Sequence, residues 1–142
     1  MLYKSYLKKL KKCPFCILKK REILKSNKSA LLILARAPYT EDHLLVIPKK
    51  HLRKINSLTK KEKEDSEKLE FYGIEKLHKK HKNVSILYRE GDKKEVGKSI
   101  NHMHIHLIPK IRIGSRNIKS EKREIYFETN YFKKIKELKK IF

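Results

Sequence analysis

The segment His102–Ile108 constrains the fold more than any other part of this chain, because histidine and apolar residues alternate strictly along it. Side chains of a β-strand point to two faces in turn, so the segment is predicted to be a strand with one imidazole face and one core face. The imidazole face carries His102, His104 and His106. A merely solvated face would more often use lysine, threonine or glutamate in a chain so rich in lysine. The alternation therefore predicts a chemical role for the three histidines.

Imidazole supports two chemistries that spacing alone does not separate. It binds transition metals, and near neutral pH it acts as a nucleophile or a general acid. The triplet Gly97-Lys98-Ser99 stands just before the strand and offers backbone N–H groups, an ammonium and a hydroxyl to an anion. It is not part of a P-loop, because the first glycine of that motif would fall on Asp92 and the motif opens a helix. Phosphate chemistry is therefore the favoured interpretation.

Apolar periodicity and capping signals place the other elements around this strand. A short helix is expected over residues 2–10, and a capping box from Thr59 to Glu62 begins a long polar helix that runs to about Lys80. His78 and His81, in that lysine-rich helix, are expected at the surface. The other expected strands are Ser29–Leu34, His43–Ile47, Val84–Tyr88 and a short one at Glu124–Glu128. Residues 89–98 and the basic stretch 111–121 are expected to be loop and turn.

The last part of the chain predicts a C-terminal helix. Asn130 is its expected cap, and one apolar stripe follows at helical spacing. The stripe consists of Tyr131, Ile135, Leu138 and Phe142. Because strands and helices follow one another without a βαβ rhythm, the fold class is expected to be α+β. The expected architecture is an antiparallel sheet of about five strands with the long helix packed on it, plus the C-terminal helix.

Composition bounds the partners without naming them. The 142 residues fit one domain, 1–142, and 38 basic against 16 acidic residues give a formal charge of +22. Such a balance attracts anions, so a nucleic-acid-binding module stays open as an alternative, although scattered lysines with few interleaved aromatics are a weak signature of one. The longest apolar run, Ala30–Ala35, is too short for a membrane span, and the N-terminus has no secretory signal. We therefore expect a cytoplasmic protein without a membrane partner.

Three motifs together resemble the histidine triad family. Residues 102–108 resemble its His-φ-His-φ-His-φ-φ signature (φ apolar), and residues 38–51 resemble its Pro-x-x-x-Gly-His-φ-φ-φ-φ-Pro-x-x-His segment. Cys13-Pro14-Phe15-Cys16 resembles the knuckle of its zinc-binding members, similar to bacterial diadenosine tetraphosphate hydrolases or phosphorylases. The resemblance implies a small α+β fold, usually a homodimer, that hydrolyses or transfers nucleotides. It gives a motif-bearing core, 13–110, and a basic C-terminal extension, 111–142.

A mechanism follows from the residues, and the resemblance implies the same roles. Attack by a ring nitrogen of His104 on phosphorus would give a nucleotidyl-histidine intermediate, with a carbonyl holding its other ring N–H. His106 would donate a hydrogen bond or proton to the departing group, and Ser99 would hold phosphate oxygens beside Gly97 and Lys98. His43 falls at the position where relatives support the triad through hydrogen bonding. Alone, it reads equally well as a turn histidine.

The cysteine pair predicts a metal site. Cys13 and Cys16 would suit a redox dithiol only in a βαβ context, which is missing, and two cysteines do not make a disulfide framework. A tetrahedral zinc needs two more ligands, for which His51 and His102 are available. The resemblance implies these same four ligands and one structural zinc per chain.

This chain also departs from the family pattern. Lys98 replaces a common glutamine, Arg89 a common asparagine, and Asp42 the glycine before His43. The family's acidic or asparagine ribose residue falls on Ala35 or Arg36, so nucleoside preference does not carry over. The predicted activity is cleavage of a phosphoanhydride, with a dinucleoside polyphosphate-type substrate. A nucleoside phosphoramidase and a hydrolase that removes adenylate from lysine or from DNA ends are the alternatives.

Overall fold

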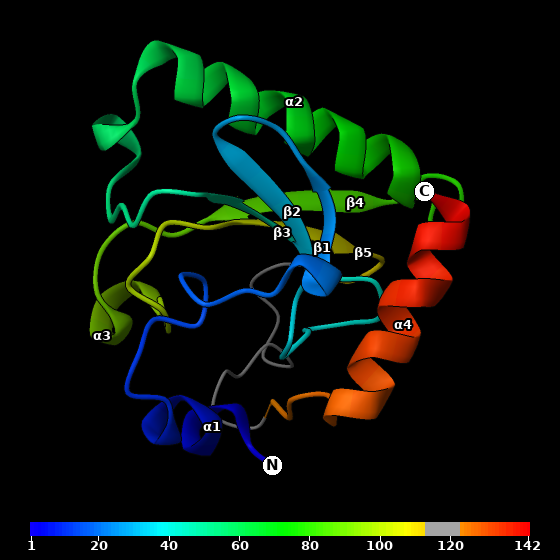
Figure 1. Ribbon diagram of the computed structural model, residues 1–142, viewed down its shortest axis with the longest axis horizontal. Helices are drawn as coiled ribbons and strands as arrows, with labels where there is room; N and C mark the ends of the chain where they lie inside the picture. The colour runs from blue at the N-terminus through cyan, green and yellow to red at the C-terminus, as the bar shows by residue number, and fades with distance from the viewer. Residues whose placement is uncertain (113–122) are drawn as a thin grey trace.

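The structure, a computed structural model, describes residues 1–112 and 123–142 (Figure 1). The first half of the chain contains α1 (Tyr3–Lys9), a 3-10 turn (Lys20–Glu22), β1 (Ile23–Ser26), β2 (Ala30–Leu34), β3 (Leu44–Pro48) and a second 3-10 turn (Ile55–Ser57). The second half contains α2 (Lys60–Leu77), β4 (Val84–Tyr88), α3 (Lys93–Val96), β5 (Ile105–Pro109) and α4 (Glu128–Ile141). Among the described residues, no helix combines the length and apolarity needed to cross a membrane.

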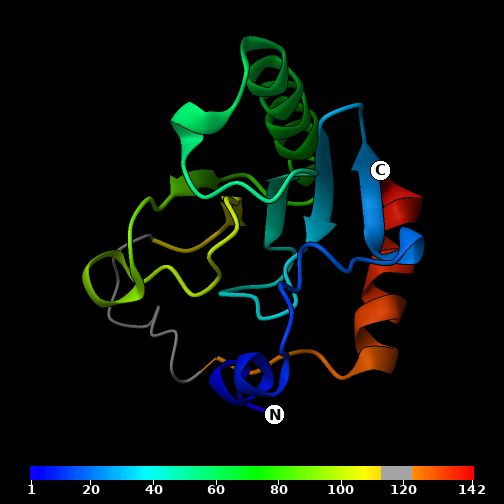
Figure 2. The same cartoon turned by 60° about the vertical axis from the view of Figure 1, so that its left-hand side comes forward.

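The five strands form one antiparallel sheet in the order β1-β2-β3-β5-β4. Helix α2 lies across one face of it, over β2, β3 and β5, and α4 lies against β1, as Figures 1 and 2 show. Alternate residues of β2 divide between two clusters, since Leu32 packs under α2 and Ile33 packs against the N-terminal segment around Phe15. The expected α+β fold, with an antiparallel sheet and a long helix packed on it, is confirmed.

The sheet has the predicted number of strands, about five, but one of them is formed by a different segment from the one predicted. Residues 124–128 do not form a strand, because Glu124 makes only an isolated bridge with Leu2 and the next backbone N–H groups bond to other loops. Ile23–Ser26, for which the sequence predicted no element, forms β1 and pairs with β2. The edge position suits β1, since a four-residue segment gains most of its stability from pairing with a buried neighbour.

The histidine strand is shorter than predicted. Strand β5 begins at Ile105, so the prediction of a strand from His102 onwards is wrong for its first three residues. The ladder cannot continue because Pro48 has no N–H and its carbonyl accepts from the His102 side chain at 2.9 Å, while the Met103 N–H bonds to Leu52. The alternation of side chains persists nevertheless. Met103, Ile105 and Leu107 are all buried in the main core.

Both long helices form where predicted, with shifted ends. In α2 the capping box is present, because Thr59 Oγ1 accepts from the Glu62 N–H and Glu62 Oε1 accepts from the Thr59 N–H. The helix ends at Leu77 rather than near residue 80. Helix α4 begins at Glu128, before Asn130, without a side-chain cap. Its predicted stripe is confirmed by burial of Tyr131, Ile135 and Leu138, with Phe142 packed beside them.

Two loop predictions met different outcomes. The stretch 89–98 holds a one-turn helix, α3, whose start is capped by Asp92 accepting from the Glu95 N–H at 2.8 Å. Of the predicted basic turn at 111–121, all but the first two residues lie outside the described part of the chain.

Candidate functional site: a histidine cavity beside a cysteine–histidine cluster

His104 lies just before β5, and it is one of the residues that line a cavity. Its Nδ1 donates to the backbone carbonyl of His102 at 2.7 Å, so in the neutral ring Nε2 is unprotonated and carries a lone pair. The cavity brings His104 together with the other residues predicted to act on phosphate. These are His43, His106, Gly97, Lys98 and Ser99. A carbonyl that holds the second ring nitrogen is the arrangement expected for an imidazole nucleophile.

A chain of hydrogen bonds sets the protonation of His106. The Tyr39 backbone N–H donates to His43 Nδ1 at 3.1 Å, so the proton of neutral His43 is on Nε2. That Nε2 lies 2.9 Å from His106 Nδ1 and donates to it. The proton of neutral His106 is therefore on its own Nε2. The Tyr39 N–H thus fixes the proton of His43, and His43 in turn fixes the proton of His106 on Nε2, so that His106 Nε2 is a hydrogen-bond donor.

Burial keeps all three cavity histidines uncharged. Desolvation lowers the pKa of His43 to about 3, and the positive charges of Arg123 and Arg89 act in the same direction. Desolvation also lowers the pKa of His104 to about 4, against the opposing effect of its bond to the His102 carbonyl. The pKa of His106 is held well below its ordinary value by burial and by the neighbouring histidines. At neutral pH each ring is thus one donor and one acceptor.

The predicted anion turn lines the same cavity. Gly97 ends α3 with φ 74°, a left-handed conformation that favours glycine. Lys98 is nearly buried, and its ammonium donates to the carbonyl of Arg53 at 3.0 Å. Burial lowers the pKa of Lys98. The turn therefore offers backbone groups and the Ser99 hydroxyl to a ligand, while the Lys98 ammonium is already held by the protein.

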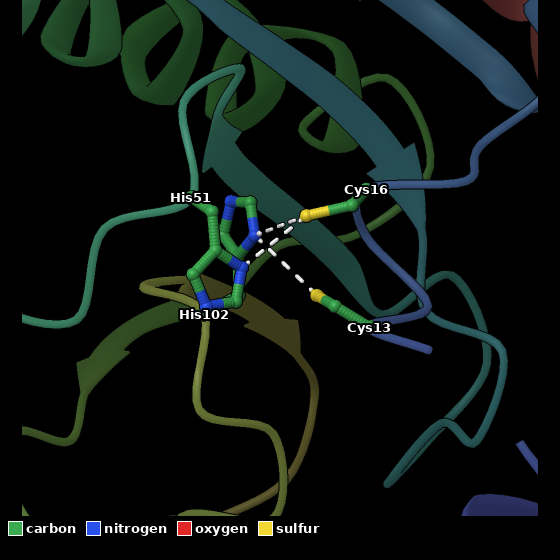
Figure 3. A group of neighbouring side chains, drawn as sticks. All are labelled: Cys13, Cys16, His51 and His102. Carbon is green, nitrogen blue, oxygen red and sulfur yellow. Dashed lines mark hydrogen bonds between the residues drawn. The ribbon is translucent and has the colours of Figure 1, made fainter. Parts of the chain in front are cut away.

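Four side chains gather beside this cavity in a metal-binding arrangement (Figure 3). Cys13, Cys16, His51 and His102 each offer one ligand atom, and the four atoms lie within 4.8 Å of one another. They come from the loop after α1, from the loop after β3 and from the segment before β5. The prediction that these residues form one cluster is confirmed.

The cluster fits a tetrahedral zinc. Cys16 Sγ lies 3.2 Å from His51 Nδ1 and 3.5 Å from His102 Nδ1, and Cys13 Sγ lies 3.5 Å from the same His102 nitrogen. Zinc bonds of about 2.3 Å to sulfur and about 2.0 Å to nitrogen place tetrahedral ligands roughly 3.5 Å apart. His102 donates its Nε2 proton to the Pro48 carbonyl, which leaves Nδ1 free for a metal.

Sequence reasoning missed residues that reach the cavity from other loops. Tyr39 stacks on His43 and His106 with ring centroids 4.9 and 5.7 Å apart, and Arg123 lies over Tyr39 at 4.2 Å. Nothing local marks Arg123, which stands just before α4. His81, expected at the surface, is nearly buried, with its Nε2 2.5 Å from Asp42 Oδ2.

Comparison with known sequences gives one family. The family model described as the HIT domain matches residues 19–113. An uncharacterized HIT-like protein of Mycoplasma genitalium is 30% identical over 127 residues, which cover 84% of this chain and 89% of that protein. The bis(5'-adenosyl)-triphosphatase of Dictyostelium discoideum is 28% identical over 102 residues, 71% of this chain and 68% of the relative.

Solved structures share the fold. The diadenosine triphosphate hydrolase of Plasmodium falciparum superposes with a TM-score of 0.73 at 23% identity, covering 92% of this chain and 84% of that one. A zinc-bound histidine triad family protein of Mycobacterium smegmatis superposes with a TM-score of 0.65 at 19% identity, covering 90% and 93%.

Proposed function

Because the chain belongs to the HIT domain family, whose model matches residues 19–113, we propose that it cleaves a phosphoanhydride bond of a dinucleoside polyphosphate. The observation that carries the proposal is the hydrogen bond from His104 Nδ1 to the His102 carbonyl, which leaves Nε2 as the acceptor nitrogen of a side chain that lines the same cavity as the anion turn. The triphosphatase of Dictyostelium discoideum supports the choice of substrate.

The proposed chemistry has two steps. His104 Nε2 attacks a phosphorus, the P–N bond forms, and the bond from phosphorus to the bridging oxygen breaks. The leaving nucleotide departs as an anion with that electron pair and accepts a hydrogen bond from His106 Nε2–H. Backbone N–H groups of residues 97–99 and the Ser99 hydroxyl stabilise the charge on the non-bridging oxygens. An oxygen of water or of inorganic phosphate then attacks the same phosphorus and loses its proton to solvent, the P–N bond breaks, and the His104 imidazole leaves with its electron pair restored.

We further propose that Cys13, Cys16, His51 and His102 hold one structural zinc ion. The donor set is soft and complete, which favours a closed site with no position for substrate. The ion would tie the loop after α1 to the segment before β5, and so to His104. The zinc-bound relative of Mycobacterium smegmatis supports this assignment.

The experiment that tests the function is a substrate panel with purified protein. Diadenosine triphosphate and tetraphosphate are compared with adenosine phosphoramidate and adenylated lysine, each with and without inorganic phosphate. We expect the highest kcat/KM on a dinucleoside polyphosphate. A preference for phosphoramidate or adenylated lysine would contradict it and favour the alternatives from the sequence. With diadenosine tetraphosphate, adenosine diphosphate formed in place of adenosine monophosphate when phosphate is added would identify phosphate, rather than water, as the acceptor.

A further inference from the structure

Arg89 follows β4 and lines the cavity beside the anion turn. Its Nη1 donates to Tyr39 Oη at 2.6 Å, and its Nε lies 3.9 Å from the point where a Cβ on Gly97 would stand. The guanidinium therefore lies between the turn and the tyrosine that stacks on His106. Arg89 thus brings a positive charge close to the histidines that line the cavity.

That charge is not neutralised within the described residues. Among residues 1–112 and 123–142, no carboxylate lies within 4.0 Å of the charged groups of Arg89, Arg123 or Lys98. Glu22 is the only acid among the described cavity-lining residues, and it faces Arg36 at 3.9 Å. Half-buried cations without counter-ions are costly, and an anionic ligand would offset that cost.

The two arginines each make one side-chain hydrogen bond among the described residues, but aromatic rings enclose Arg123 more closely. Arg123 donates to the Ala37 carbonyl at 2.7 Å and lies over the rings of Tyr3 and Tyr39, so much of its guanidinium serves the protein. Arg89 makes one side-chain hydrogen bond among the described residues, to Tyr39. A guanidinium has five N–H donors in a planar fork that matches a phosphate oxygen pair. Arg89, which is half-buried and lies beside the turn, therefore has donors available for a ligand.

We propose that Arg89, with the charge of Arg123 behind Tyr39, binds the phosphates that follow the one attacked by His104. The ligand class is a nucleotide with a linear chain of three or more phosphates. This inference rests on the proposed function, because His104 defines the attacked phosphate. The turn at 97–99 and His106 supply donors for one phosphate. A second phosphate of the ligand needs further donors, which Arg89 supplies.

The test compares two substrates in three variants. We expect Arg89→Gln to lower kcat/KM for diadenosine triphosphate at least about tenfold, while kcat/KM for adenosine phosphoramidate, which has one phosphate, changes less than about threefold. Arg89→Lys keeps the charge and loses the fork, so it recovers part of the loss. Arg53→Gln is the matched control, because Arg53 is exposed and its side chain is not among those lining the cavity. Equal losses on both substrates, or no loss on either, would overturn the proposal.

A binding measurement separates this inference from the proposed function. Calorimetric titration of the unmodified protein with inorganic tripolyphosphate and with orthophosphate requires no turnover. We expect tripolyphosphate to bind more tightly, and Arg89→Gln to weaken it at least about tenfold without a comparable change for orthophosphate. If the protein cleaves no nucleotide yet shows this pattern, the function is wrong and the polyphosphate site stands. Tripolyphosphate binding that ignores Arg89 overturns the site whatever the activity.

Discussion

The histidines of one short segment belong to two different sites, and hydrogen bonds with backbone carbonyls separate them. The Nε2–H of His102 donates a hydrogen bond to the Pro48 carbonyl, which leaves Nδ1 facing the sulfur atoms of Cys13 and Cys16. The Nδ1–H of His104, two residues later, donates a hydrogen bond to the His102 carbonyl, which leaves the lone pair on Nε2. The same side chain thus suits a soft metal in one place and a phosphorus in the other. Residue type alone does not decide between these chemistries. What decides is which ring nitrogen donates to a backbone carbonyl, because the other nitrogen is then free to act as a ligand or a nucleophile.

The two sites also differ in exposure and in the charge around them. Cys16 and His51 are exposed, and the metal cluster needs no other protein group to complete a tetrahedron. The cavity histidines are nearly buried, and arginines stand near them. We therefore expect the metal cluster to contribute mainly stability and the cavity to contribute mainly turnover. Changes in one site should leave the property of the other largely intact.

The largest effect is expected at His104. His104→Ala removes the nitrogen that we propose attacks phosphorus, so we expect kcat to fall by about 10⁴-fold or more. Affinity for a non-hydrolysable dinucleoside polyphosphate should stay within about threefold, because the other binding groups remain. Steady-state kinetics and equilibrium titration measure the two quantities. His78→Ala is the control, since His78 is exposed and outside the cavity. Turnover retained by His104→Ala would refute the separation of roles.

Loss of a metal ligand should affect stability first. Cys16→Ala removes an exposed side chain with little packing, so its effect reports on the metal. We expect zinc to fall from about one per chain to near zero, with destabilisation on the order of 3 kcal/mol, roughly 10 °C in Tm. Below the new Tm, kcat should change less than about fivefold. Elemental analysis and thermal unfolding measure these. Stable wild-type protein purified without metal would contradict the metal site.

His43 should affect kcat without the total loss seen at His104. His43→Ala removes the donor that fixes the proton of His106, so we expect kcat to fall about 10²-fold with little change in KM. The Tm is measured alongside, because His43 is buried and its removal leaves a space. A fall in Tm with unchanged kcat at low temperature would make His43 a packing residue only.

The smallest effect is expected at Asp42, in the turn before His43. Asp42 is buried with φ 62°, and its carboxylate lies 2.9–3.0 Å from the ammonium groups of Lys80 and Lys134 and 2.5 Å from His81 Nε2. Although burial opposes it, the hydrogen bonds from these groups lower the pKa of Asp42. A lowered folded-state pKa adds stability above the unfolded pKa of about 4, and this stability is lost as pH falls through the folded pKa.

Asp42→Asn tolerates the left-handed backbone and removes the charge. We expect it to lower the free energy of unfolding by about 2 kcal/mol at pH 7, and the difference from wild type to shrink as pH falls below about 4. Urea unfolding at both pH values measures this. Glu41→Gln, an exposed neighbour that contacts the same lysines, should cost no more than about 0.5 kcal/mol. If the difference in free energy of unfolding between wild type and Asp42→Asn does not vary with pH, the charge of Asp42 does not stabilise this turn.

Local signals made part of the fold predictable. The capping box at Thr59 and the alternation around Ile105 depend on neighbours in sequence, and both were found. Strand β1 was missed because its four residues become a strand only through pairing with β2, and α3 because one turn shows no periodicity. The start of β5 depends on the carbonyl of Pro48, which lies far away in the chain.

The site shows the same division. The histidines and the turn at 97–99 are close in sequence, so their meeting was predictable, and the metal cluster followed from the kinds of ligand available. Tyr39, Arg89 and Arg123 meet only through the tertiary fold. The burial of His81 was missed for a related reason. His81 follows α2, whereas its partner Asp42 lies in a turn that precedes α2 by many residues.

The most direct test of the account is to locate the covalent intermediate. The protein is mixed with diadenosine triphosphate, quenched within one turnover, and mapped by mass spectrometry under neutral conditions that preserve a P–N bond. We predict a nucleoside monophosphate on Nε2 of His104, absent from His104→Ala and unaffected in His78→Ala. An active enzyme that shows the adduct on another residue, or that shows none while His104→Ala retains turnover, would contradict the division of the histidines.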